Sequence, residues 1–554
     1  AGQNEGAAGD VTVASTARND YLKYNNNLIP FVSSAKAGAG FSYSQVNLSS
    51  DSLAKIGDGV ALSAKKLDVT ADNSGIAITG GAAGQSSGGK ANFLGSIFNQ
   101  YVDNTTYALV GQGSYDLNYA DATAVNVAAQ DNSAPVVVVG TYSASKGASV
   151  GASIGWQEVK RDTVAFFGND ERGVKGESVA EVDFNSGGTA DIDGGVEVTA
   201  KNSGIHIIVA IAGSSSSAST GSTSGGSAGT PAKVGVAGSF GLIDNEDHTL
   251  AQVQGFQAFD SGAVTVSASN TTEQHIGAGG VAIAKGGTSA TGIAGAVSVN
   301  IAEGSTISGV RDIGIIDSGD IIVSTTRAGL MVSAAVGLGV ATGASGVAIT
   351  GSASWLRKDE LTESVVANIG SNPGGENSGG LSVTAVDNTS LISTGGAISY
   401  AGKAGIGAGL ARAENLGSVR AVIEDLGTDQ SKLRLYGDVT VSANNQLSII
   451  SVAGTLAAGG GTGVSAAGSV SLVNIALEES ATVARSYIDM NADSSVPTHD
   501  LTVSAKQQVF FVSVAGAVAF GGQAGFGIGF AYTPHSGSVN ATLLNSHVDD
   551  ANDI

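Results

Sequence analysis

Apolar and polar residues alternate in short stretches that recur along the whole chain. "VEVTA" at Val196 and "VTVSA" at Val264 place an apolar residue at every second position, with Glu, Thr or Ser between. A period of two is typical of a β-strand with one buried face. Helical periodicity is absent throughout, so the pattern predicts an all-β protein.

This strand is the most regular part of a repeat that occurs nine times. Its second apolar residue marks each copy, and the successive spacings are 56, 58, 71, 68, 57, 60, 58 and 62 residues. Fixed-period self-similarity is the signature of a repeat architecture. The marker residues are Val13, Val69, Val127, Val198, Val266, Val323, Val383, Val441 and Val503.

The rest of each repeat is also patterned. A small polar segment follows the first strand, then come a second apolar strand, a glycine-rich corner such as "GGQAGFG", and two further strands. Asn tolerates the left-handed conformation and suits a corner. We therefore expect four short strands per repeat, joined by tight corners. The Asn residues assigned to the first corner are Asn73, Asn132, Asn202, Asn270, Asn388 and Asn444.

A unit of this size buries its apolar face only by stacking on neighbours. The pattern thus predicts a parallel β-solenoid, with valine ladders inside and Asn and Thr ladders at corners and outside. Two or three coils per repeat at ~4.8 Å per strand would give a rod roughly 90–130 Å long. The alternative is a series of tandem antiparallel hairpin repeats, since a "GGxxG" corner between apolar arms is also compatible with a hairpin turn.

Two regions depart from the repeat. Residues 213–230, "GSSSSASTGSTSGGSAGT", form a Ser/Gly/Thr-rich insertion that predicts a surface loop. Residues 1–60 contain a partly irregular first repeat, with the irregular part at 19–30. We interpret residues 1–554 as one continuous solenoid and as a fragment of a longer protein.

Charge and composition narrow the functional class. The formal net charge is −22, and the sequence contains no cysteine. A chain without a basic stripe is not expected to bind nucleic acid. The glycine-interrupted apolar stretches are too short for a membrane helix, so we expect no membrane insertion in this segment. The lack of cysteine favours a secreted bacterial protein over a disulfide-rich one.

The repeat resembles those of large bacterial surface adhesins. The residues that carry the resemblance are V-x-V-[TS]-A, a following Asn-Ser/Thr, a Gly/Ala-rich arm, a GG corner and a closing "GSVSxN". They are similar to the repeats of filamentous haemagglutinin-like and leukotoxin-like proteins exported by type V routes, including autotransporters. The resemblance implies a right-handed parallel β-helix, export to the cell surface and a role in attachment or scaffolding.

Candidate chemistry is sparse. The six histidines show no metal-ligand spacing, and His206 in "GIHIIVA" is interpreted as structural. We expect no catalytic residues, no metal, no cofactor and no enzymatic activity. Trp156 in "WQEVKRD" and Trp355 in "SWLRKDE" occupy equivalent positions in their repeats. These tryptophans are candidate ligand-contact edges that would stack on a sugar; otherwise they cover a strand end, with the charges outside for solubility.

These patterns favour an extracellular stalk or filament segment of a bacterial adhesin, active in cell adhesion or biofilm contact. The expected partner is a host or neighbouring-cell surface or an extracellular glycan. One alternative is a carbohydrate-binding or carbohydrate-cleaving β-helix. The other is an extracellular fibre that self-associates through its Gly/Ala-rich faces.

Overall fold

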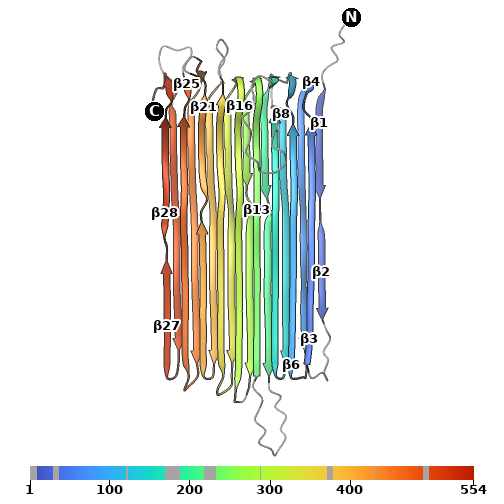
Figure 1. Cartoon of the computed structure of the whole chain (residues 1–554), viewed down its shortest axis with the longest axis vertical. Coiled ribbons are helices and arrows are strands. Elements are labelled where there is room, and N and C mark those ends of the chain that lie inside the picture. Colours follow the sequence, from blue (N-terminus) through green and yellow to red (C-terminus); the bar gives the residue numbers. More distant parts are fainter. Residues whose placement is uncertain are drawn as a thin grey trace, which may run out of the picture.

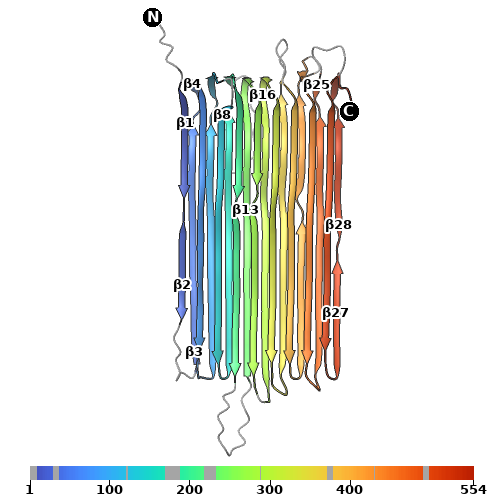
Figure 2. The same ribbon diagram turned by 180° about the vertical axis from the view of Figure 1, so that it is seen from behind.

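The computed structural model describes residues 9–28, 37–119, 123–168, 187–217, 233–286, 288–370, 379–428, 431–490 and 498–554. These residues form a flat slab of two long parallel sheets, with the strands running along the longest axis (Figure 1). The chain order crosses the slab from one side to the other, as both views show (Figure 2). The described part is all-β with parallel strands in stacked sheets.

Sheet A has twelve strands. They are β1 (Asp10–Arg18), β2 (Tyr21–Leu28), β5 (Lys66–Ser86), β8 (Thr123–Ser145), β11 (Gly195–Ser203), β12 (Ile205–Ser217), β14 (Val264–Asn270), β15 (Glu273–Lys285), β17 (Ile321–Ala341), β19 (Leu381–Ala401), β23 (Val439–Gly459) and β26 (Leu501–Phe520).

Sheet B has fourteen strands, and a small third sheet has three. Sheet B comprises β3 (Ala37–Ile56), β4 (Val60–Ala64), β6 (Ala91–Val110), β7 (Gly113–Leu117), β9 (Ala148–Gly168), β10 (Gly188–Ile192), β13 (Lys233–Ser261), β16 (Ala290–Ser318), β18 (Val347–Ile369), β20 (Ala404–Asn415), β21 (Ser418–Leu426), β24 (Val464–Ala484), β27 (Ala524–Tyr532) and β28 (His535–Leu544). The third sheet comprises β22 (Leu433–Arg434), β25 (Tyr487–Asp489) and β29 (His547–Asp549).

The marker valines of the sequence repeat are register partners in sheet A. Val13 pairs with Val69, Val69 with Val127, and the series continues without a break to Val441 and Val503. From Val69 to Val441 these side chains have no exposed surface. The expected valine ladder therefore fills the interior, because stacking puts each valine on its equivalent in the next coil.

The register corrects the expected dimensions. Each repeat adds one coil, not two or three, because equivalent residues of successive repeats are direct neighbours. Eight steps of ~4.8 Å span only about 38 Å along the stacking axis. The long axis instead follows the strands, and the 29 residues of β13 extend about 96 Å at ~3.3 Å per residue. Pairings between the named strands are all parallel among the described residues, which rules out the tandem hairpins there.

The expected division into four short strands is wrong for most coils, although β11 and β14 do end at the polar segment. Residues 66–86 form one uninterrupted strand, β5, and Asn73 lies in its middle as an inward-facing, buried residue. Asn202 and Asn270 are likewise buried inside the slab, whereas Asn132 and Asn388 are exposed on its outer face and Asn444 lies on the outer side of its strand. The polar segment therefore lies along one face of sheet A and not at a corner of the coil, and only its alternate residues form an interior polar layer. The expected Thr and Ser ladder does lie outside, as Thr199 and Ser267 show.

The slab interior changes character along the strands. At the valine end it holds a large apolar core that includes the packed rings of Tyr115, Phe167, Phe256 and Phe259. Near the glycine-rich corners the interior is lined by Ala, Ser and Gly. There the sheets approach so closely that a Cβ on Gly280 would lie 2.3 Å from the carbonyl oxygen of Gly295 in the opposite sheet.

The two departures from the repeat are partly described. Gly213–Ser217 of the expected loop belong to β12, and residues 218–230 lie outside the described residues. In the first repeat, residues 21–28 form β2, paired in register with β5, and residues 29–36 are outside the described part.

Candidate functional site: a tryptophan row outside and an ionic ladder inside

The two tryptophans lie in one row on the outer face of sheet B. Trp156 pairs with Leu242 of the next coil, Leu242 with Val299, and Val299 with Trp355. Three coil steps of ~4.8 Å therefore separate the tryptophans by about 14 Å. The structure thus brings both residues to equivalent outer positions on the same face.

The neighbours of the two indoles differ. Trp156 is 37% exposed and lies 6.5 Å from the ring of Tyr101. Trp355 has the guanidinium of Arg412 5.2 Å from its ring centroid, and its Nε1 donates a 3.0 Å hydrogen bond to Glu414 Oε2. Trp156 therefore offers the more open aromatic surface, while Trp355 is held by a cation and a carboxylate.

The charges next to the tryptophans are not all outside. In "WQEVKRD", Glu158 and Lys160 face solvent, whereas Arg161 has no exposed side-chain surface. In "SWLRKDE", Lys358 is fully buried and Glu360 is nearly so. The interpretation that these charges serve solubility is therefore wrong for Arg161, Lys358 and Glu360, because alternate side chains of an extended strand point inward.

Arg161 is the centre of a buried ion cluster. Its Nε donates to Asp247 Oδ1 at 2.8 Å and its Nη2 to Asp247 Oδ2 at 2.5 Å. Its Nη1 donates to the Ser203 carbonyl at 2.7 Å and lies 3.6 Å from Asp131 Oδ1. Asp131 also accepts hydrogen bonds from Asn73 and Asn104. This cluster connects both sheets through the slab.

A second cluster lies further along the same interior layer. Arg327 Nε donates to Glu360 Oε2 at 2.7 Å, and Lys358 Nζ donates to Asp387 Oδ2 at 2.5 Å. Lys358 Nζ is also 3.4 Å from Glu360 Oε2, so the two cations share one carboxylate. Asn270 connects the clusters by donating to Asp247 and offering its carbonyl to Arg327. We call the two clusters together the ionic ladder.

Electrostatics in the ladder follow from these contacts. Burial alone would raise the pKa of Asp247, but the charge and hydrogen bonds of Arg161 outweigh it and hold the pKa well below its usual range. The pKa of Asp131 is raised by burial, which its more distant contact with Arg161 only partly offsets. Burial and the nearby Arg161 lower the pKa of His206 to about 3, so this imidazole is neutral.

Within the described ranges, no group of three or more His, Asp or Glu side chains is placed to hold a metal ion. His206 is fully buried on β12, in line with a structural role. The ionic ladder is closed to solvent, so its chemistry is the mutual neutralisation of charges that fix neighbouring coils in register. The tryptophan row is the part that solvent reaches.

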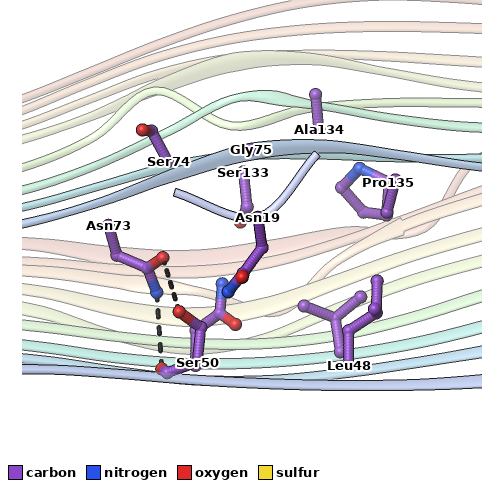
Figure 3. A pocket seen from close by; sticks show the side chains of 12 residues that line it. Asn19, Leu48, Ser50, Asn73, Ser74, Gly75, Ser133, Ala134 and Pro135 are labelled. Atoms are coloured by element: carbon purple, nitrogen blue, oxygen red, sulfur yellow. Dashed lines mark hydrogen bonds between the residues drawn. The ribbon is translucent and has the colours of Figure 1, made fainter. Parts of the chain in front are cut away.

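One small cavity lies beside the ladder, at the first coils (Figure 3). In Figure 3, Asn73 and Ser50 bond to each other across the cavity wall; Ser50 Oγ donates to Asn73 Oδ1 at 2.9 Å. The space is about 20 Å³, enough for a single water molecule. It is too small to bind an organic ligand.

Comparisons with protein families, curated proteins and solved structures give no match. Among the described residues there is no helix with the length and hydropathy needed to cross a membrane.

Proposed function

We propose that this chain is a structural segment of an extracellular bacterial adhesin, built as a right-handed parallel β-helix of about nine repeats. The observation that supports the proposal is the unbroken register of the marker valines. Each coil shields the apolar residues of the next, so the architecture extends by adding coils. Such a segment supports or spaces a contact with a host cell, a neighbouring cell or an extracellular glycan.

The dimensions refine this proposal. One coil per repeat advances the stack by only ~4.8 Å, so the segment is a wide ribbon and not a thin rod. A ribbon whose strands run across its growth axis presents broad outer faces. These faces, more than the length of the stack, are the surface that such an adhesin offers to its surroundings.

Deletion of one register-defined coil tests the structural role. Residues 264–320 start at Val264, the partner of Ile321, so their removal leaves Val196 above Ile321 with matching register. We expect a folded protein with a cooperative unfolding transition and an unchanged β-type circular dichroism spectrum. Collapse of the whole chain on removal of this coil would contradict the proposal.

The tryptophan row favours a carbohydrate-binding surface as a second candidate. Trp156 and Trp355 lie in one outer row, and sugars stack on exposed aromatic rings. A glycan array with the intact protein, Trp156→Ala and Trp355→Ala tests this candidate. We expect a bound glycan to be lost with Trp156→Ala first, because its ring is the more open of the two.

A further inference from the structure

The acidic residues are segregated along the strands. Eight segments that flank the glycine-rich corners contain none of the 48 Asp and Glu residues, and their charged residues are Lys90, Lys146, Lys233, Lys285, Lys403 and Arg412. We call these segments the glycine half and the remaining residues the acidic half. The segments are 76–101, 134–157, 205–243, 274–300, 330–356, 390–413, 448–474 and 509–532.

The glycine half has an apolar outer face on sheet B. Two ridges of large side chains cross neighbouring coils there, and several of these side chains are well exposed, such as Ile406 at 43% and Phe530 at 53%. Exposed apolar patches of this extent mark contact surfaces. The corner-side ridge contains Val150, Val236, Ile293, Ile349 and Ile406. The inner ridge contains Ile154, Phe240, Val297, Leu410, Val470 and Phe530, with the small Ala353 in register between Val297 and Leu410.

A furrow of small residues separates the ridges. Ala152, Gly238, Gly295, Gly351, Ala408 and Gly468 stand in register along it. A Cβ added at Gly238, Gly351 or Gly468 would meet no atom of this chain within 4 Å. Because glycine weakens a strand, and the chain's own packing does not need it here, the furrow indicates close approach of another backbone.

We propose that this outer face of sheet B binds the same face of a second copy of the chain in antiparallel orientation. A ridge beside a furrow is the shape expected for contact with another rigid protein surface. Lipid chains are fluid and would not require such a shape. The acidic half carries 20 of the 26 Lys and Arg residues and all 48 acids, a formal charge of −28. Parallel overlap would bring two such halves together, and antiparallel overlap keeps them at opposite ends.

The row order fits this arrangement. In this arrangement a two-fold axis runs along the stacking direction, midway between the furrow and the inner ridge. The inner ridge of each copy then lies in the furrow of the other. It also places the corners that carry Lys146 and Lys403 against the partner's outer row, which reads Asp103, Lys160, Glu246, Glu303 and Asp359 along the stack. Four of the five charges in this row are acidic, so each border pairs corner lysines with a row of net negative charge, while Lys160 stands in the same coil as Lys146.

The available area is sufficient for a stable dimer. About five row intervals of ~6.8 Å and the six coil steps of ~4.8 Å from Ile154 to Phe530 give roughly 1,000 Å² per copy. Standard specific interfaces bury about 800 Å² per partner. A similar furrow crosses the outer face of sheet A at Gly396, Gly454 and Gly516, so association can continue beyond two copies.

Sedimentation and small-angle X-ray scattering of the full chain test the proposal. We expect a mass of at least twice 54.2 kDa. We also expect a dimer about 1.5 times as long as the monomer, because copies of ~96 Å overlap by about 45 Å. Gly351→Gln fills the furrow and should raise the dissociation constant at least tenfold. Ser418→Gln, on the outer face of the acidic half, is the matched control and should leave it unchanged.

Three outcomes would overturn the inference: a monomer at all concentrations, a dimer no longer than the monomer, or a Gly351→Gln protein that dimerises with an unchanged dissociation constant. Flotation of monomeric protein with phosphatidylcholine/phosphatidylglycerol vesicles, lost in Gly351→Gln, would assign the face to a bilayer instead. The inference depends on the solenoid and not on the adhesin role. Association and folding are measured separately, so the chain can fail to associate while circular dichroism still shows a folded solenoid. That result would contradict this inference and leave the proposed structural role intact.

Discussion

Arg161 and Asp247 are register partners on neighbouring strands of sheet B and form a two-point ion pair with no exposed side-chain surface. Breaking one partner of such a pair leaves an uncompensated charge in a low-dielectric interior. The pair is therefore a point where one side-chain change should have a large effect.

We predict that Arg161→Met lowers the free energy of unfolding by about 3–5 kcal/mol. Asp247 and Asp131 would lose their shared cation while remaining inside the slab. Urea denaturation followed by circular dichroism measures the change.

Lys160→Met is the matched control for this substitution. Lys160 is the adjacent residue, its side chain is 54% exposed, and its contacts with Glu158 and Glu246 are at the surface. Surface ion pairs contribute about 0–1 kcal/mol. Equal losses in the two variants would contradict a structural role for the ionic ladder.

The register was predictable from the sequence, whereas the interior polar layer was not. Aligning one valine per repeat identifies the partners because a slip of one residue would turn every valine outward. The turn preference of Asn73 favours a corner. In the structure it is buried and bonds to Ser50 and Asp131, partners 23 and 58 residues away that no local pattern reveals.

The tryptophan row and the ionic ladder show the same limit. Trp156 and Trp355 were placed at equivalent positions by repeat alignment alone. The burial of Arg161 and Lys358 follows from the alternation in "WQEVKRD" and "SWLRKDE", together with aligned Asp131 and Asp387 on the facing sheet. The alternation in these segments indicates that Arg161 and Lys358 point inward. The general preference of charged side chains for solvent favours the outer face, and for these two residues that expectation is wrong.

We predict that Glu479 makes stability fall as the pH rises from about 4.5 to 7. Burial raises its pKa to about 7, although the hydrogen bond from Asn445 opposes the shift. Across this range the folded state binds a proton that the unfolded state has released, so the slope of unfolding free energy against pH is negative. The contribution is on the order of 3 kcal/mol, fully present below the unfolded pKa and lost above pH 7.

The measurement is the unfolding free energy of the intact protein and of Glu479→Gln between pH 4.5 and 8. The difference between the two profiles isolates this carboxyl from the other titrating groups. We expect the variant to gain relative stability as the pH rises. Profiles that run parallel throughout would show that Glu479 is not protonated in the folded protein near neutral pH.

Glycines on the two faces of sheet A should respond in opposite directions to the same substitution. A Cβ on inward-facing Gly395 would lie 2.1 Å from the carbonyl oxygen of Leu410 in the opposite sheet. A Cβ on outward-facing Gly454 would meet nothing within 4 Å.

We therefore predict that Gly395→Ala destabilises the fold by about 2 kcal/mol or more, because two backbones must separate to admit the methyl group. Gly454→Ala should be neutral or stabilising by about 0.5–1 kcal/mol, because alanine restricts the unfolded chain more than glycine does. Thermal unfolding, measured at a concentration where the protein is monomeric, compares the two variants on equal terms. If both variants lost the same stability, the sheets would not be in backbone contact at Gly395, and the narrow interior of the glycine half would be wrong.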